Sequence, residues 1–238
     1  MRSAAEWSLK WYEGDWPGRK KGSRPADIGG ATLRGLSAYE RSRDPRNCGA
    51  GHGSAGNGSL IRCIPTAFLT DSRDERIRES MEISAITHND ARCTVACVAY
   101  NEIVRALVES KTPQEAVAIG IRVSRELECP AVEEAIRRGQ GMSITRIVEK
   151  GTGEELPDRT SRFVLQSLAV AISALMDSRS FEDVLVDVVR IGGDTDTNGA
   201  IAGGLLGARH GVRDIPWRWE KICQFRDEFE DLVMQMTT

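Results

Sequence analysis

The sequence predicts an all-α fold, and three observations support this prediction. Apolar residues recur at helical spacing across residues 89–110, for example at Val95, Val98 and Ile103. Helix-start signals are frequent, and the clearest is the capping box at residues 112–115 (TPQE), with proline at the first helical position. No long run of alternating, strand-like residues occurs in the sequence. We therefore expect one compact helical domain that covers residues 1–238.

In the first half of the chain, each expected helix has a local signal. Residues 13–59 are rich in Gly, Pro, Ser, Arg and Asp, and only residues 31–39 read as a helix there. Apolar spacing predicts helices at about 75–86 and 89–110. Pro113 opens a helix to about residue 126, and Pro130 opens a short one that ends near residue 139.

In the second half, a strongly apolar helix is expected at 163–176, after a polar stretch at 151–160. Residues 180–183 (SFED) resemble a second capping box, whose helix ends near the glycine pair at 192–193. The next helix, at 198–208, contains Gly203, Gly204 and Gly207 within two turns. Each glycine costs a helix about 1 kcal/mol relative to alanine, which predicts close packing there. A last helix follows Pro216, with apolar residues at Trp217, Trp219, Ile222 and Phe225.

Composition places the chain among ordinary globular proteins. It has 238 residues, of which 40% are hydrophobic and 28% charged, and its formal net charge is −3. No apolar run approaches the roughly 20 residues of a membrane span, and the N-terminus lacks an apolar signal core. We expect a cytoplasmic protein without membrane association. Basic residues form short runs such as 19–21 (RKK), which predict solvated surface rather than a nucleic-acid patch.

The six cysteines are predicted to be reduced and to pack as small hydrophobic residues. They form no C-x-x-C pair and no zinc-finger spacing. Cys93 and Cys97 lie four positions apart in an apolar helix, without a histidine or a second cysteine pair beside them.

The acidic segment 192–198 (GGDTDTN) carries the sharpest chemical signal. Asp194 and Asp196 alternate with threonines between the end of one helix and the start of the next. Helix capping is one interpretation, because Asp and Thr are favoured at helix starts. Two carboxylates this close repel each other, however, and a hard divalent cation would relieve the repulsion with oxygen ligands that Mg²⁺ prefers. Capping and metal binding are both open at this point.

The longer segment 192–208 (GGDTDTNGAIAGGLLGA) resembles the C-terminal signature of the ADP-ribosylglycohydrolase family. Three further stretches agree in the family's order, at residues 27–30 (DIGG), 56–62 (GNGSLIR) and 87–90 (THND). The downstream residues 215–219 (IPWRW) also fit, so the resemblance spans nearly the whole chain.

This resemblance implies an all-α fold with a binuclear Mg²⁺ centre, sometimes Mn²⁺, in a central cleft. It implies that Asp194, Asp196 and Thr197 are metal ligands, and that such ions orient ribose hydroxyls and activate water. It also implies an ADP-ribose pocket that includes the residues Ser54, Gly56, Asn57, Gly58 and His88. Glycine suits this role because a backbone without Cβ atoms can approach a pyrophosphate closely.

One departure from the family pattern matters for activity. The family has a Thr-Asp-Asp-Thr stretch near its N-terminus that completes the metal centre, and upstream of it a Gly-Asp-x-x-Gly segment followed by a catalytic glutamate. Neither stretch occurs in this sequence, in which Glu6, Glu13 and Asp15 are the only acidic residues before Asp27. We therefore expect an N-terminally truncated family domain with half of a metal site and no assigned catalytic residue.

Two other motifs are weaker. Residues 51–56 (GHGSAG) match G-x-G-x-x-G formally, but no apolar strand precedes them, so a dinucleotide fingerprint is not indicated. A serine-hydrolase elbow fails because His52 stands where its first glycine belongs. The bland interpretations stay open: a surface loop at 51–58, and a structural histidine at His88 with Asp90 as a helix cap.

The function predicted from the sequence is Mg²⁺-dependent hydrolysis of the glycosidic bond of ADP-ribose attached to a protein side chain or a small molecule. ADP-ribose or an ADP-ribosylated protein is the expected partner. The alternative is a catalytically inactive binding or structural homologue on the same scaffold, because the second acidic cluster is missing.

Overall fold

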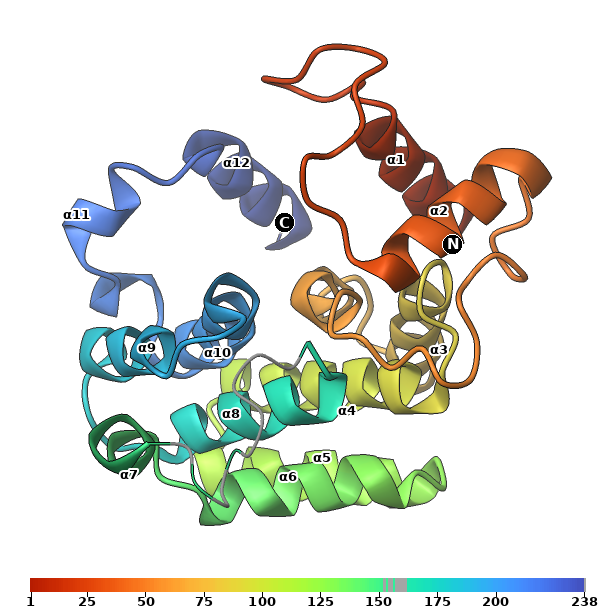
Figure 1. The fold of residues 1–238 in the computed structure, drawn as a ribbon. Helices are drawn as coiled ribbons and strands as arrows, with labels where there is room; N and C mark the ends of the chain where they lie inside the picture. The colour runs from red at the N-terminus through yellow and green to blue at the C-terminus, as the bar shows by residue number, and fades with distance from the viewer. Residues whose placement is uncertain (152, 154–155, 157–161, 238) are drawn as a thin grey trace.

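The computed structural model describes residues 1–151, 153, 156 and 162–237, and Figure 1 shows their arrangement. In this part of the chain the backbone is helical or irregular, with two isolated bridges, Ala50–His88 and Gly56–Phe163, and no strand. The predicted all-α fold is confirmed. The helices are α1 (Arg2–Tyr12), α2 (Gly30–Ser42), α3 (Arg73–Ala85), α4 (Ala91–Val108), α5 (Pro113–Glu126), α6 (Pro130–Gly141), α7 (Ile144–Lys150), α8 (Val164–Met176), α9 (Phe181–Arg190), α10 (Thr195–His210), α11 (Trp217–Glu220) and α12 (Arg226–Thr237), with short 3-10 turns at Leu60–Arg62, Ile64–Ala67 and Val212–Asp214.

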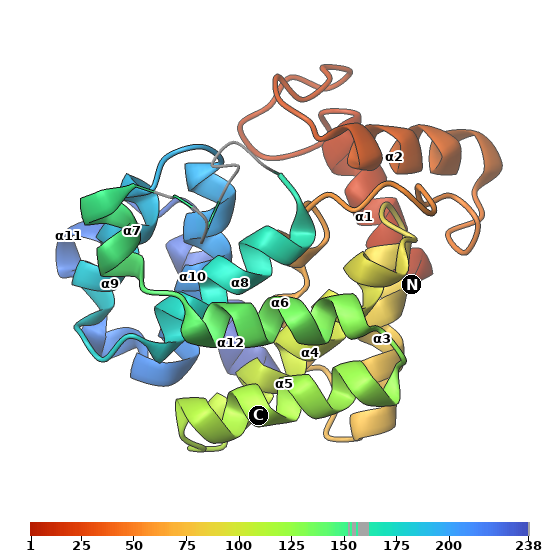
Figure 2. The ribbon, with the colours of Figure 1, turned by 60° about the horizontal axis from the view of Figure 1, so that its bottom comes forward.

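The main core forms around α4 and α8. Both helices are apolar on nearly all sides, and a helix of that kind is stable only when neighbours surround it. Helix α4 packs against α3, α5 and α10, and α8 packs against α6 and α10. Figures 1 and 2 show α4 and α8 between these neighbours. Because α10 packs against both of them, it is held near the centre of the molecule.

A second, smaller hydrophobic cluster joins α1 to α2. These two helices lie together at the upper right of Figure 1, above the end of α3. The hydroxyl of Tyr39 in α2 donates a hydrogen bond of 2.6 Å to Glu6 in α1. The buried members of the cluster are Ala5, Leu9, Tyr12, Leu36, Tyr39, Cys48 and Ile86. That residues 1–238 form a single domain stays a prediction.

Helix-start signals in the sequence predicted the starts of several helices. Thr112 accepts from the backbone N–H of Glu115, whose side chain accepts from the N–H of Thr112, so the capping box is confirmed. Ser180 caps α9, and Asp90 caps α4 by accepting from the N–H of Arg92. Helix α10 begins three residues before the predicted start at 198.

Sequence reasoning missed two helices and merged two others. Helix α1 begins without a side-chain cap, and α7 has only seven residues, so neither gives a strong local signal. The single helix expected after Pro216 is instead α11 followed by α12. Phe225 lies between them with a φ of 62°, a left-handed conformation that a continuous helix does not contain.

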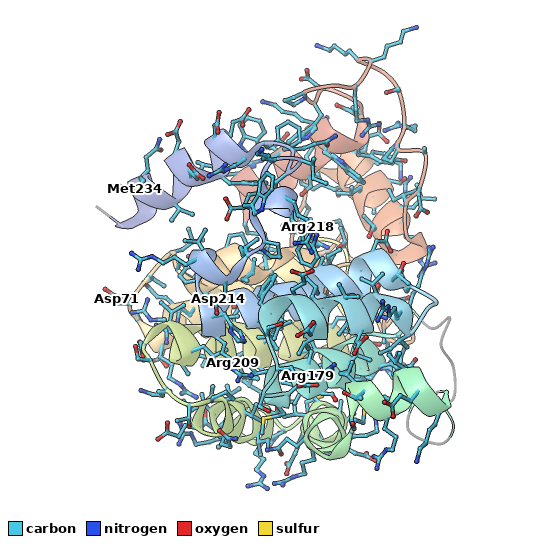
Figure 3. All side chains as sticks on the ribbon, turned by 90° about the vertical axis from the view of Figure 1, so that its left-hand side faces the viewer. Asp71, Arg179, Arg209, Asp214, Arg218 and Met234 are labelled. Atoms are coloured by element: carbon cyan, nitrogen blue, oxygen red, sulfur yellow. The ribbon has the colours of Figure 1, made fainter. Side chains whose placement is uncertain are left out.

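Helix α10 is fixed at its C-terminal half by arginine contacts. Arg209 donates to the carbonyls of Leu175 and Asp177, which satisfies the end of α8. Arg179 pairs at 2.8 Å with both Asp177 and Asp187 and ties the start of α9 to the same place. Figure 3 shows Arg179 and Arg209 within this helical body, whereas Met234 lies at the far end of the exposed α12.

Gly203, Gly204 and Gly207 of α10 do not share one role, and this corrects the expectation of close packing at all three. A Cβ at Gly204 would lie 2.2 Å from the hydroxyl oxygen of the buried Tyr100, whereas at Gly203 it would make ordinary contacts with Leu185 at 3.7 Å. A Cβ at Gly207 would meet nothing within 4 Å.

We therefore expect opposite results from alanine at two positions of α10. Gly204→Ala should destabilise the protein by about 1–3 kcal/mol, because Tyr100 must move and its 2.8 Å hydrogen bond to Ile201 is strained. Gly207→Ala should stabilise it by up to about 1 kcal/mol through helix propensity. Urea unfolding of both variants measures the difference, and equal free energies of unfolding would contradict the packing described here.

The cysteines are free, as predicted. Cys48, Cys63, Cys93, Cys97 and Cys129 are buried among apolar side chains, whereas Cys223 is exposed and departs from the predicted packing. Within the described residues, no helix combines the length and the apolar character that crossing a membrane requires.

Candidate functional site

A cavity of about 840 Å³ lies between the α1–α2 pair and the start of α10. Its walls come from α1, from residues 27–32 and 56–62, from the turn at 87–88, from Arg162 and from the first turn of α10. Its volume is within the range of ligand pockets in proteins. Seven of the eight residues predicted to bind substrate or metal border it, namely Gly56, Asn57, Gly58, His88, Asp194, Asp196 and Thr197.

Asn57 links three segments at the floor of this cavity. Its buried side-chain amide donates to a carboxylate oxygen of Asp194 at 2.6 Å and to the hydroxyl of Ser167 at 2.9 Å. Its backbone N–H donates to the carbonyl of Arg162 at 2.9 Å. We call residues 56–58 the glycine loop. These bonds fix it against α8 and the start of α10, so it forms an ordered wall of the cavity and is not a free surface loop.

Gly56 and Gly58 allow a histidine ring to approach this loop. A Cβ at Gly58 would lie 3.0 Å from Cε1 of His88, and one at Gly56 would lie 3.3 Å from its Nε2. The His88 ring therefore lies directly against the two glycines, in the space that larger residues would fill. The backbone N–H of Gly56 itself donates to the carbonyl of Ser54 at 3.0 Å.

His88 is neutral in this setting. Burial, followed by the positive charges of Arg62 and Arg34, lowers the pKa of His88 from 6.5 to about 3. Its Nδ1 lies 2.7 Å from the hydroxyl of Thr87, which also accepts a 2.6 Å hydrogen bond from Arg62. The Thr87 oxygen accepts from Arg62, and we assign its proton to the bond with Nδ1, an assignment in which the ring proton is on Nε2, toward the glycines. His88 can thus donate a hydrogen bond at the cavity wall.

Arg62 brings a positive charge to the same wall. Its guanidinium donates to the carbonyls of Gly58 and Ile83 and to the Thr87 hydroxyl. Among the residues that the structure describes, no carboxylate forms an ion pair with Arg62. A guanidinium that has only neutral partners and borders a cavity favours an anion there.

The start of α10 turns its acidic side chains to the cavity. Asp194 is 9% exposed and stands at the cap position, yet its side chain makes no capping hydrogen bond. One carboxylate oxygen accepts from Asn57, and the other lies 3.9 Å from Nε of Arg162. The exposed Asp196 accepts from the N–H of Thr197 at 2.9 Å. Capping therefore does not explain Asp194.

These residues fit a metal ion only in part. Asp194, Asp196 and Thr197 offer carboxylate and hydroxyl oxygens at one edge of the cavity, which are ligands of the type that Mg²⁺ prefers. In the described ranges, no three His, Cys, Asp or Glu residues come together as a group that could hold a metal ion. The described residues therefore offer oxygens that could form one side of a cation's ligand shell, and they do not make up the ligand set of a binuclear centre.

Ser54 is the one predicted site residue outside the large cavity. It borders an adjoining cavity of about 360 Å³ and accepts a 2.9 Å hydrogen bond from Arg34. Gly56 and Arg162 border both cavities. The hydroxyl of Ser54 is therefore on the other side of the loop from Asp194.

Sequence reasoning missed several residues that line the large cavity. Arg62 and Thr87 belong to segments that the family resemblance had already singled out, but only a three-dimensional contact shows that they hold His88. Residues 27–30, which the sequence analysis identified only as a stretch that agrees with the family, also line the cavity. The further omissions are Trp7, Trp11 and Trp16, whose concentration near the N-terminus was visible in the sequence.

The fold and this site define a helical protein of the ADP-ribosylglycohydrolase class. A family model described as ADP-ribosylglycohydrolase matches residues 2–238, and the chain belongs to this family. A known structure entitled "ADP-ribosylglycohydrolase-related protein complex" has the same fold, with a TM-score of 0.78 and 24% identity over 99% of this chain and 72% of that one.

Curated relatives carry the names of hydrolases. The chain is 27% identical to the ADP-ribosyl-[dinitrogen reductase] glycohydrolase of Rhodospirillum rubrum, over 83% of this chain and 60% of that protein. It is 26% identical to the ADP-ribosylarginine hydrolase Tri1 of Pseudomonas putida, over 96% of this chain and 57% of that protein. The chain therefore spans less than two thirds of the length of these relatives.

Proposed function

We propose that this protein binds the ADP-ribosyl group in the 840 Å³ cavity and, with Mg²⁺, hydrolyses the glycosidic bond that joins the group to a protein side chain or a small molecule. The observation that carries the proposal is that one cavity brings together the glycine loop, the neutral His88, the acidic start of α10 and Arg62, which has no carboxylate partner among the described residues. We place this activity in the cytoplasm, where the buried free cysteines stay reduced.

The chemistry of ADP-ribose matches the polarity of these walls. Its diphosphate suits the Arg62 guanidinium, which lies beside the glycine loop and borders the cavity. The Nε2–H of His88 suits a phosphate or ribose oxygen, and its low pKa makes it a hydrogen-bond donor rather than a general base near neutral pH. Asp194 and Asp196 suit ribose hydroxyls, which are hydrogen-bond donors.

Mg²⁺ or Mn²⁺ would be held by Asp194, Asp196 and Thr197, and a bound ion would supply positive charge and an activated water. Mg²⁺ dehydrates reluctantly and usually needs substrate oxygens or further carboxylates. We therefore expect the ion to bind weakly to the chain alone and more strongly when ADP-ribose is present.

A second candidate function is binding without hydrolysis. It is favoured by the incomplete ligand set at the start of α10 within the described residues. In this case the protein would recognise ADP-ribosylated partners or free ADP-ribose and leave the glycosidic bond intact.

Two measurements test the proposal on the full chain. Calorimetry with ADP-ribose, with and without MgCl₂, measures binding, and release of ADP-ribose from an ADP-ribosylated protein measures hydrolysis. Binding with Mg²⁺-dependent release supports hydrolysis, whereas binding without release supports the second candidate. A chain that binds no ADP-ribose under either condition contradicts both.

We expect the Asp194→Asn, Asp196→Asn double variant to lose the Mg²⁺-dependent part of ADP-ribose binding and to keep the part seen without Mg²⁺. The amides keep the size of both side chains but remove the charges that attract a cation. The matched control is Asp227→Asn with Asp231→Asn on the exposed helix α12. An unchanged Mg²⁺ dependence in the first variant would exclude this edge of the cavity as the metal site.

A further inference from the structure

Three of the chain's five tryptophans border one cavity, and neither the metal edge nor the glycine loop explains them. Trp7 and Trp11 come from α1, and Trp16 comes from the segment that follows it. We call these three residues the tryptophan wall. The other two tryptophans, Trp217 and Trp219, lie in α11 and do not border the cavity.

Core packing accounts for only one member of this wall. Trp11 packs against the smaller hydrophobic cluster, whereas Trp7 is 56% exposed and Trp16 is 37% exposed. Their rings contact each other edge to face, with centroids 6.3 Å apart and planes at 86°. Large aromatic side chains that stay exposed beside a cavity are characteristic of ligand-binding surfaces.

Cations flank the wall and hold its rings in place. The Lys10 ammonium lies 4.2 Å from the centroid of the Trp7 ring. Arg19 lies 5.7 Å from the Trp11 ring and donates a 2.6 Å hydrogen bond to the Trp11 carbonyl. Such cation–π contacts orient the indoles and make the surroundings of the wall positive.

The cavity therefore has two chemically different parts. One part offers Arg62, His88, Asn57 and the acidic start of α10, and the other offers planar indoles. ADP-ribose has the same division, because its diphosphate and riboses are polar and its adenine has a flat π-face. Because the adenine is covalently attached to the ribose and the diphosphate, we expect it to bind in the same cavity as these polar groups.

We propose that the tryptophan wall binds the adenine base of the ADP-ribosyl group by stacking on Trp7 or Trp16, and that these two residues determine the preference for an adenine nucleotide over a plain sugar phosphate. This inference rests on the proposed function. The wall acts on binding alone and takes no part in bond cleavage.

The test compares ADP-ribose, AMP and ribose 5-phosphate as ligands for the full chain by calorimetry. At least one of the variants Trp7→Ala and Trp16→Ala should weaken ADP-ribose and AMP binding by roughly tenfold or more, as expected for the loss of a base–aromatic stack. Binding of ribose 5-phosphate should not change, because it carries no base. Trp7→Phe should restore most of the loss, since phenylalanine keeps a π-face.

The matched control is Trp217→Ala, which removes an indole that is 64% exposed and distant from the cavity wall. Unchanged ADP-ribose affinity in both Trp7→Ala and Trp16→Ala would overturn the inference while leaving the proposed function intact. An equal loss for all three ligands would also overturn it, because the tryptophans would then support the cavity as a whole. A wild-type chain that binds none of the ligands contradicts the proposed function and this inference together.

Discussion

Arg62→Met is expected to weaken ADP-ribose binding by at least about 30-fold. Arg62 donates to the Thr87 hydroxyl and to main-chain carbonyls, and no carboxylate in the described part of the chain neutralises it. Losing one partner of a desolvated, hydrogen-bonded charge pair costs about 2–5 kcal/mol, and 2 kcal/mol corresponds to roughly 30-fold in affinity. Calorimetry with ADP-ribose measures the loss.

The control for this prediction is Arg122→Met, which removes an exposed guanidinium from α5. It should leave the affinity unchanged, because a surface charge is screened by solvent and salt. Adenosine, which lacks phosphate, should bind Arg62→Met and the wild-type chain with similar affinity. An equal loss for adenosine and ADP-ribose would mean that Arg62 supports the loop and does not receive an anion.

The second large effect is a dependence of stability on pH that His88 causes. The pKa of His88 is lowered from 6.5 to about 3 by burial and by Arg62 and Arg34. Between these two values the unfolded chain takes up a proton at this position and the folded chain does not. The stability from neutral His88 is therefore complete above pH 6.5 and is lost as the pH falls toward 3.

At pH 4.5, two pH units below 6.5, the loss from this one residue should be about 2–3 kcal/mol. His88→Gln carries no group that titrates in this range, so the variant should lose about 2–3 kcal/mol less than the wild type between pH 7.5 and pH 4.5. Urea unfolding of both proteins at the two pH values measures the difference. If both proteins lose the same free energy, His88 is protonated in the fold, and its proposed role as a neutral donor fails.

Local sequence signals predicted the helices that have strong caps or strong apolar patterns. The box at Thr112 and the prolines at 113 and 130 determine helix starts through neighbouring backbone groups, so a sequence window contains the needed information. Helix α1 has no side-chain cap and is stabilised by packing in the smaller cluster. Helix α7 has a Ser143 cap but only seven residues, two of which are buried in the main core, so a sequence window contains little of what stabilises it. The break at Phe225 likewise has no glycine or proline to announce it.

Much of the site came from the family resemblance, because the spacing of Asp194 and Asp196 alone left capping and metal binding open. The structure adds what a motif cannot contain, namely the contacts between segments. Arg62 of the segment 56–62 forms one hydrogen-bonded chain with Thr87 and His88 of the segment 87–90. Asn57 holds Asp194, which lies 137 positions further along the chain. Whether these residues bind metal and ADP-ribose stays a prediction.

The hydrogen bond between Asn57 and Asp194 closes a loop of 137 residues. The floor of the cavity therefore depends on a contact between segments far apart in the chain, and closing so long a loop carries an entropic cost. A ligand that needs this floor recognises only the completed chain, and it raises the midpoint of thermal unfolding of the whole molecule by mass action. A protease cut in the connection between α5 and α6, far along the chain from either residue, would then weaken retention of the ligand.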